Sequence, residues 1–394
     1  MSKNLFQLLI EYRQLAMEYR PECNLSSGFP DFPAFPEYLP NYITDVVDKE
    51  SDHLTYQYTR GFGHPRLVKA ISELYGKLLG RKIDPLTEVL ATIGGYEALF
   101  CAIHGFAGPG DEVIIVEPYF DCYVPMTIST GATPVFVPLK MYPKPVSGTN
   151  PNYASSKDWV LDPDELARAF NSKTKLFILN TPHNPLGKVF TCDELQLIAD
   201  LCKKHDVICI SDEVYEWLIY KPAKHIRMAT LEGMWGRTIT IGSAGKIFSA
   251  TGLKVGWVYC SAKLMRNLFT VHQNCVHCGT TFEATARCLE YELSLLGTPD
   301  CYLENLSTIL QPKRDYFCRV LRDAGFAPSI PEGGYFIVSK WSNLGKVKIN
   351  TACNLLVYLG LHCHAKMIAD WKPFYMASQL ARVTYKNILN SDLL

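Results

Sequence analysis

The chain has 394 residues, with 39 lysines and arginines against 39 aspartates and glutamates, and 48% of its residues are hydrophobic. At roughly 150 residues per domain this is two to three domains' worth of chain, and the apolar content excludes a disordered or fibrous protein. The balanced charge gives no field that attracts nucleic acid or an anionic membrane, so we expect neither as a partner. Apolar runs such as residues 113–116 are far shorter than the ~20 residues that span a bilayer, which predicts a soluble globular protein.

The cysteines, 14 in all, are spread irregularly from Cys23 to Cys363. This spread is not the framework of a small secreted protein and favours reduced thiols. The stretch Cys275-Val-His-Cys278, with His272 just before it, is the one local pattern with metal-ligand character. A structural zinc normally needs a second ligand pair at a readable spacing, and the sequence offers none, so we predict no metal site.

The N-terminal segment contains Glu11 and Glu18 and has no long apolar core. This composition matches neither a secretory signal nor an acid-poor transit peptide. Together with the reduced cysteines, it predicts a cytoplasmic protein and leaves an organellar isoform open.

In chain order, the apolar pattern alternates between element types. Residues 5–17 carry apolar side chains at helical spacing and are expected to form an amphipathic arm. A second helical pattern runs over 66–79, and apolar runs at 89–93 and 113–116 predict two strands.

The clearest pattern lies in the middle of the chain. Apolar runs at 175–179, 207–210 and 238–241 predict buried strands. Thr191 followed by Glu194 has the spacing of a capping box that begins a helix. Strand, helix and strand in this order imply right-handed crossovers and a parallel sheet.

The last part of the chain predicts a different architecture. A helical stretch at 310–324 is followed by Gly-Gly-Tyr-Phe-Ile-Val at 333–338, which suits a smaller domain. The predicted fold class is α/β, with a large, mainly parallel sheet domain and a smaller α+β domain. We expect an N-terminal arm and first part of the small domain at 1–40, the large domain at 41–305, and the small C-terminal domain at 306–394.

Residues with chemical functions follow the predicted strands, at the edge where α/β sheets bind ligands. In chain order they are Gly94, Gly95 and Tyr96, then Phe120, Asn180 and Asn184, Asp212 and Tyr215, and Ser243 and Lys246. The glycines and the serine suit a phosphate held on backbone amides at the start of a helix. A lysine beside them is the residue type that forms Schiff bases with carbonyls.

Pyridoxal 5'-phosphate meets these demands together, because it binds a lysine as a Schiff base and pairs its pyridinium nitrogen with an acid. A nucleoside triphosphate is the competing phosphate ligand. The stretch Gly-Ser-Ala-Gly-Lys-Ile at 242–247 lacks the four-residue gap and the Ser/Thr of a P-loop, which disfavours that alternative.

Over nearly its whole length the sequence resembles the class I aminotransferases, which are pyridoxal-phosphate enzymes of fold type I. Within them it is similar to the group of kynurenine aminotransferases, glutamine transaminase K and cysteine S-conjugate β-lyases. The motifs that carry the resemblance are Gly-Phe-Pro-Asp-Phe-Pro at 28–33, Gln-Tyr-Thr at 57–59, Gly-Gly-Tyr at 94–96, Glu-Pro-Tyr-Phe-Asp-Cys-Tyr at 117–123, Asn-Pro-Leu-Gly-Lys-Val-Phe at 184–190, Ser-Asp-Glu-Val-Tyr at 211–215 and Gly-Ser-Ala-Gly-Lys-Ile-Phe-Ser-Ala-Thr-Gly-Leu-Lys-Val-Gly-Trp at 242–257.

The resemblance implies a role for each residue around the cofactor ring. Lys246 is expected to hold the cofactor as a Schiff base and to carry a proton between the substrate Cα and the cofactor. Asp212 is expected to pair with the ring nitrogen and keep it protonated. Tyr215 and Asn184 would hydrogen-bond the phenolic oxygen, and Phe120 would stack on the ring. Lys246, Asp212 and Tyr215 form the predicted catalytic set.

The resemblance also implies how the phosphate and the substrate are bound. The residues expected around the phosphate are Gly95, Tyr96, Ser243 and Lys254. Tyr58 is expected to reach the phosphate of a neighbouring subunit, which implies a homodimer with shared active sites. Arg382 is expected to clamp the substrate α-carboxylate with two hydrogen bonds, and Gly28 and Asn184 would complete the clamp.

The predicted function is transamination between an L-amino acid and a 2-oxo acid, of the kynurenine–oxoglutarate or glutamine–phenylpyruvate type. Expected donors are glutamine, kynurenine and sulfur or aromatic amino acids, with β-elimination from cysteine S-conjugates as a side reaction. Two departures from the group's pattern are His183, expected at the rim of the site, and a short stretch after Arg382. The alternatives are a carbon–sulfur lyase, another class I aminotransferase specificity, or a catalytically impaired dimeric binding protein.

Overall fold

The computed structural model describes residues 36–48, 57–142, 154–279, 283–323, 325–340 and 375–379. The expected arm at 5–17 and the motif at 28–33 lie outside the described residues. No helix in the described ranges combines the length and the apolar character that a membrane crossing requires.

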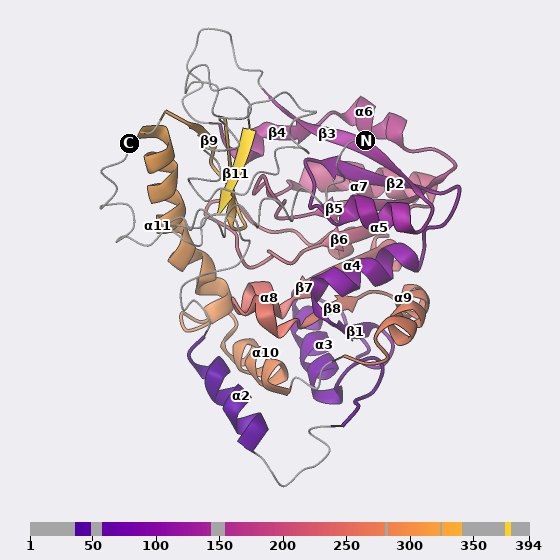
Figure 1. The fold of residues 1–394 in the computed structure, drawn as a ribbon, viewed down its shortest axis with the longest axis vertical. Helices are drawn as coiled ribbons and strands as arrows, with labels where there is room; N and C mark the ends of the chain where they lie inside the picture. The colour runs from indigo at the N-terminus through magenta and orange to yellow at the C-terminus, as the bar shows by residue number, and fades with distance from the viewer. Residues whose placement is uncertain are drawn as a thin grey trace, which may run out of the picture.

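An eight-stranded sheet forms the centre of the molecule (Figure 1). Its strands are β1 (Val89–Thr92), β2 (Glu112–Glu117), β3 (Thr133–Met141), β4 (Trp159–Leu161), β5 (Thr174–Asn180), β6 (Ile208–Asp212), β7 (Thr238–Ser243) and β8 (Gly256–Tyr259). They lie in the order β1-β8-β7-β6-β5-β2-β3-β4, and the run from β7 to β3 is parallel. Antiparallel strands flank this run, with β4 at one edge and β8 and β1 at the other. The predicted α/β class and mainly parallel sheet are confirmed.

Strand β8 runs antiparallel to both of its neighbours in the sheet. It is antiparallel to β7, and β1 is antiparallel to β8, so β1 runs in the same direction as β7. The carboxyl end of β1 therefore opens on the same edge as the ends of β5, β6 and β7. Strand β8 (Gly256–Tyr259) was not among the strands predicted from the sequence.

Helices cover both faces of the sheet (Figure 1). They are α2 (Tyr38–Asp48), α3 (Pro65–Leu79), α4 (Gly94–His104), α5 (Tyr123–Ser129), α6 (Pro163–Ala169), α7 (Cys192–His205), α8 (Ala244–Ile247), α9 (Ala262–Cys275), α10 (Glu283–Leu295) and α11 (Tyr302–Asp323). Val113 and Ile115 of β2 are buried with side chains of α4, α5 and α9, whereas Ile114 and Val116 are buried with those of α6 and α7. Burial on both faces explains why the strands read as continuous apolar runs.

Helix α7 begins as its capping box predicts. The Thr191 hydroxyl oxygen accepts a hydrogen bond from the Glu194 N–H (3.3 Å), and the Glu194 carboxylate accepts one from the Thr191 N–H (2.9 Å). These two bonds satisfy backbone donors that have no partner inside the helix. The helical pattern over 66–79 forms α3.

A separate antiparallel sheet contains β9 (Ala327–Ser329), β10 (Phe336–Lys340) and β11 (Tyr375–Gln379) and lies beside α11 (Figure 1). Leu306 and Phe317 of α11 share a buried cluster with Tyr215 and Tyr335, which joins this smaller part to the end of β6. The domain boundaries at 40/41 and 305/306 stay predictions. Helices α2 and α11 run through these positions.

Candidate active site

A cavity of about 310 Å³ opens at the carboxyl ends of the central strands. The predicted site residues that line it are Gly95, Tyr96, Phe120, Asn184, Asp212, Tyr215, Ser243, Lys246 and Lys254. They come from segments far apart in the sequence, and the parallel strands bring them together because their carboxyl ends share one edge. The structure therefore gathers the residues that the strand-end argument selects.

Asp212 ends β6 and is buried at the floor of the cavity. The Tyr123 hydroxyl donates a hydrogen bond to its Oδ2 (2.7 Å), and the Val214 N–H approaches its Oδ1 (3.4 Å). Burial raises the pKa of the Asp212 carboxyl to about 6, although both donors and the Lys246 charge act to lower it. The two donors therefore orient this carboxylate, but its negative charge is not fully balanced by the protein. Such an acid can bind a cationic group of a ligand.

Lys246 lies on α8, directly after β7, and its side chain keeps part of its surface open to the cavity. Its Nζ lies 5.4 Å from the centre of the Tyr215 ring, and the Tyr335 hydroxyl donates to its backbone oxygen (3.0 Å). Burial of the amine lowers the pKa of Lys246 to about 8, and the nearby Lys254 charge adds to this effect. An amine with this pKa is neutral for a substantial fraction of the time near pH 8.

One side of the cavity is suited to an anion. The first turn of α4 begins at Gly94, whose φ is +75°, and the adjoining backbone packs so closely that a Cβ on Gly256 would lie 2.5 Å from the Gly94 carbonyl carbon. Lys254 adopts the left-handed conformation (φ +55°), and its Nζ lies 3.5 Å from where a Cβ on Gly94 would be. Ser243 ends β7 beside this turn. Backbone amides, a hydroxyl and an ammonium group together form a site for a phosphate-sized anion.

Asn180, Asn184 and Tyr215 also line the cavity. The Asn184 N–H donates to the Asn180 side-chain oxygen (2.6 Å), and the Asn180 Nδ2 donates to the Asp212 backbone oxygen (3.0 Å). The Asn184 Oδ1 is buried without a partner, so its amide group can be satisfied by a polar atom of a ligand. Burial raises the pKa of Tyr215 far above its ordinary value, which keeps its hydroxyl a neutral donor.

The aromatic wall is Phe120, whose ring meets those of Tyr96 and Tyr123 edge-on, at centroid distances of 6.4 Å and 5.8 Å. Tyr58 does not line the cavity of its own chain. It is 85% exposed, and its ring lies nearly perpendicular to that of His277, with the two ring centroids 5.4 Å apart. The predicted substrate ligands Gly28 and Arg382 lie outside the described residues.

His183 is not at the rim of the site, as its sequence context suggested. It is 3% exposed, and burial lowers the pKa of its imidazole to about 3, with the Lys188 charge adding to the effect. The expectation was wrong because the segment after β5 turns back into the protein: the His183 N–H donates to the Lys188 oxygen (2.8 Å). His183 is therefore a neutral, buried residue next to Asn184 in the chain rather than a solvent-exposed one.

The sequence did not reveal the contacts of Tyr123 and Asn180 or the position of Phe336. Tyr123 lies in the quoted motif at 117–123, so its position was known but its bond to Asp212 was not. Asn180 was recognised as the residue that ends a strand, without a partner. Phe336, which comes from the smaller sheet and lines the cavity, had no local signal.

The aminotransferase class I and II family model matches residues 20–385. Mouse kynurenine–oxoglutarate transaminase 3 is 50% identical over 340 residues, which cover 85% of this chain and 72% of that protein. Human kynurenine–oxoglutarate transaminase 1 is 49% identical over 336 residues, covering 85% of this chain and 78% of that protein.

Solved structures agree with these relatives. N-Succinyldiaminopimelate aminotransferase from Mycobacterium tuberculosis superposes with a TM-score of 0.84 at 30% identity, over 96% of this chain and 94% of that one. The Escherichia coli protein YbdL, which has a methionine aminotransferase function, gives a TM-score of 0.83 at 27% identity, over 96% and 94% of the two chains. The chain therefore belongs to the class I and II aminotransferase family, and it is an aminotransferase.

Proposed function

We propose that the protein uses pyridoxal 5'-phosphate, bound in this cavity, to exchange an amino group between an L-amino acid and a 2-oxo acid. The proposed donors are kynurenine, glutamine and sulfur or aromatic amino acids, because relatives that are half identical are named kynurenine–oxoglutarate transaminases. The observation that carries the proposal is that the Lys246 amine and the Asp212 carboxyl line the same cavity.

The residues present fit this cofactor. Asp212, whose charge is only partly compensated, faces the cavity, and an anion site lies at the start of α4. When bound, pyridoxal 5'-phosphate supplies an aldehyde that condenses with amines and a ring that withdraws electrons from the substrate Cα.

Lys246 would bind the cofactor and then move the substrate's Cα proton. Its Nζ must be neutral to accept that proton, and the lowered pKa, about 8, provides the neutral form near physiological pH. The Tyr335 hydrogen bond to the backbone of Lys246 limits where the amine can reach. We propose that cysteine S-conjugates undergo β-elimination as a side reaction, because it needs the same removal of the Cα proton by Nζ.

Asp212 would hold a proton on the ring nitrogen. Its Oδ2 is held by the Tyr123 hydroxyl, and its other oxygen by the weaker contact with the Val214 N–H. A cation placed beside this carboxylate would supply the missing compensation and lower its pKa from about 6. Tyr215 and Asn184 would donate to the ring's phenolic oxygen, and Phe120 would cover one face of the ring.

The remaining elements of the proposal concern assembly and substrate binding. We propose a homodimer in which Tyr58 reaches the neighbouring site, which its 85% exposure and its place outside its own cavity support. Arg382, with Gly28 and Asn184, would clamp the substrate α-carboxylate. All described cysteines are free thiols, which supports a reducing compartment such as the cytoplasm.

A panel of amino donors and 2-oxo acids, assayed with the purified protein, tests the function. We expect kynurenine and glutamine to be consumed with matching formation of the amino acid derived from the acceptor. Lys246→Ala should abolish turnover by about 10⁴-fold, whereas the exposed Lys263→Ala on α9 should retain it. Turnover that survives Lys246→Ala would contradict the proposal, and release of pyruvate and ammonia from cystathionine without transamination would favour the lyase.

Complementation tests the shared sites. Lys246→Ala and Tyr58→Ala subunits, each impaired alone, should regain activity when they are mixed and allowed to exchange. Each mixed dimer then has one site with both native residues. Mixtures that stay as inactive as the separate variants would show that Tyr58 does not serve a neighbouring subunit.

A further inference from the structure

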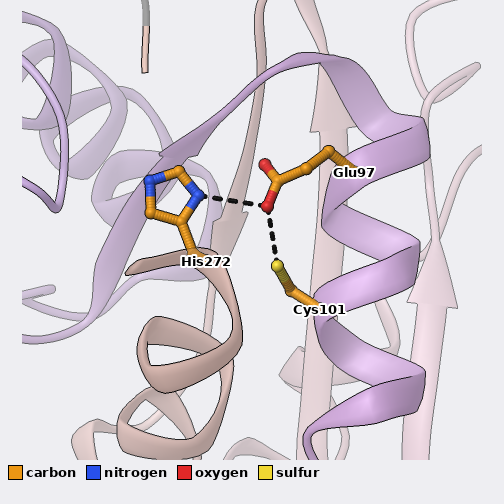
Figure 2. A group of neighbouring side chains, drawn as sticks. All are labelled: Glu97, Cys101 and His272. Atoms are coloured by element: carbon orange, nitrogen blue, oxygen red, sulfur yellow. Dashed lines mark hydrogen bonds and ion pairs between the residues drawn. The ribbon is translucent and has the colours of Figure 1, made fainter. Parts of the chain in front are cut away.

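A second cluster of reactive side chains lies between α4 and α9, outside the residues that line the cavity (Figure 2). Figure 2 shows Glu97 and Cys101 on α4 facing His272 on α9. The Cys101 thiol donates to Glu97 Oε1 at 2.7 Å, and His272 Nδ1 lies 3.1 Å from the same oxygen. The donor atoms of all three residues lie within 4.8 Å of one another.

The cluster is buried and lacks a cation. His272 and Cys101 are fully buried, and the Glu97 side chain is 12% exposed. Another group with this spacing among the described residues, Glu213 with Glu216 and His225, receives the Arg227 guanidinium. The partners of Glu97, by contrast, are a thiol, an imidazole and the Ile93 N–H (3.1 Å).

Cys275 lies near the cluster, although its thiol is not among the donor atoms that lie within 4.8 Å of one another. It lies three residues after His272, on the same face of α9, and burial, Glu97 and the Cys275 thiol together raise the pKa of Cys101. Cys275 is exposed at the end of its helix, so it also offers a route from solvent to the buried donors. The sequence showed the pair His272 and Cys275 without a second pair. The fold provides that second pair on α4.

We propose that Glu97, Cys101 and His272, with Cys275, form a binding site for Zn²⁺ or a similarly thiophilic divalent cation. This proposal does not depend on the proposed substrate or cofactor. Imidazole, thiolate and carboxylate are the ligands that zinc prefers, in groups of four. Zinc–ligand distances of about 2.0–2.3 Å require Glu97 Oε1 to move away from Cys101 Sγ and His272 Nδ1 by less than about 1 Å. The Cys275 side chain must turn toward the cluster to become the fourth ligand.

Charge and proton balance are consistent with this site. The cation displaces the thiol protons of Cys101 and Cys275, so that two protons are released and two Zn–S bonds form. His272 binds through Nδ1 and carries its proton on Nε2. The Glu97 carboxylate and the Cys101 thiolate neutralise the 2+ ion in the buried part of the site, and the Cys275 thiolate adds one negative charge at the exposed end of α9, where water can solvate it.

Cation binding would act on the first turn of α4. Glu97 holds the Ile93 N–H at the start of the helix whose next residues, Gly94 to Tyr96, line the anion side of the cavity. An ion bound between α4 and α9 therefore links the position of this turn to α9. A ligand that binds only the folded protein also raises its melting temperature as the ligand concentration increases.

Titration of the chelator-treated holoenzyme with Zn²⁺, against a chromophoric chelator, tests the site, and Co²⁺ reports thiolate coordination by its visible spectrum. We expect one Zn²⁺ ion per subunit to bind tightly, and the Co²⁺ form to show the visible bands of thiolate coordination. Cys101→Ser and His272→Gln should weaken binding by at least about tenfold, because even indirect partners of a metal ligand contribute that much.

Matched controls are Cys278→Ser, in the same loop region, and Cys192→Ser, an exposed thiol on α7; both should bind as the native protein does. Where a buried substitution prevents folding, the exposed Cys275→Ser provides the test and should also weaken binding. The proposal is overturned if no equivalent binds tightly, or if the bound equivalent is unaffected by Cys101→Ser, His272→Gln and Cys275→Ser.

Discussion

Two neighbouring carboxyl groups at the end of β6 have opposite environments. Asp212 faces the cavity, and burial raises its pKa to about 6. Glu213 is equally buried, and burial alone would raise its pKa too, but His225, Arg227 and Ser211 together lower it below its ordinary value. His225 Nε2 lies 2.8 Å from its Oε2, and the Ser211 hydroxyl donates to its Oε1 (2.7 Å).

We propose that this difference separates an acid that serves the cofactor from one that serves the fold. Glu213 has its full set of partners within the protein, so it contributes to stability whether or not a ligand is bound. The Lys246 charge compensates Asp212 only in part, and such a group is destabilising until a ligand supplies the rest of the charge. Adjacent positions in one motif, Ser-Asp-Glu at 211–213, thus have different electrostatic environments.

The largest expected effect is on catalysis at Asp212. Asp212→Asn should lower kcat by about 10²–10³-fold, because the ring nitrogen loses the charge that keeps it protonated. Glu213→Gln should change kcat far less in the protein that remains folded. Steady-state kinetics at saturating cofactor measure both. Equal losses of kcat in the two variants would remove the distinction between them.

The next effect is on stability, where the substitution at Glu213 should cost more than the substitution at Asp212. Glu213→Gln should lower the free energy of unfolding by about 3–5 kcal/mol, because it breaks a buried charge network. Asp212→Asn should leave the cofactor-free protein as stable as the native one or more so. Denaturant unfolding of both cofactor-free variants near neutral pH provides the comparison. An Asp212→Asn variant that is the less stable of the two would contradict the account.

The pH dependence of stability should differ in direction. The folded pKa of Asp212 is raised from 3.8 to about 6, so its destabilising effect is present above pH 6 and disappears as the pH falls toward 4. Cofactor-free Asp212→Asn should therefore gain about 1–3 kcal/mol over the native protein as the pH rises through this window.

Glu213 should behave in the opposite way. Its folded pKa is lowered, so its stabilising contribution is present above its ordinary pKa of 4.5 and is lost as the pH falls below that value. The difference between the native protein and Glu213→Gln should then shrink in acid. A stability difference that instead grows between pH 4.5 and lower values would be incompatible with a lowered pKa.

The smallest expected effect belongs to Tyr123. Tyr123→Phe removes the 2.7 Å donor to Asp212 and should raise the pKa of this carboxyl further. We expect a loss of about 1–3 kcal/mol in cofactor binding, typical of a hydrogen bond to a charged group. Fluorescence titration of the cofactor-free protein measures it. Unchanged affinity would mean that the Val214 N–H alone orients Asp212.

Much of the cavity lining was predictable from the sequence, because it follows from backbone order. Asp212 follows β6 directly and Lys246 lies three residues beyond β7, so a parallel sheet is enough to bring them to one edge. Strand β8 lies antiparallel between β7 and β1. Because β1 is in turn antiparallel to β8, the carboxyl end of β1 still lies at the same edge as that of β7.

Contacts between side chains of different elements could not be predicted in the same way. The bond from Tyr123 to Asp212 depends on how α5 sits over β6, and the burial of His183 depends on a turn that brings its N–H to Lys188. The spacing of Glu97 and Cys101 is visible in the sequence, but their approach to His272 requires the packing of α4 on α9.

The account's central claim is that Lys246 and Asp212 hold opposite ends of one pyridoxal 5'-phosphate ring. Nitrogen-15 NMR of the protein loaded with ring-labelled cofactor tests it most directly, because the chemical shift reports whether the ring nitrogen is protonated. We expect a protonated nitrogen in the native protein and in Lys263→Ala, and an unprotonated one in Asp212→Asn, with the cofactor still attached to Lys246. A ring nitrogen whose protonation is the same in the native protein and in Asp212→Asn would contradict the claim.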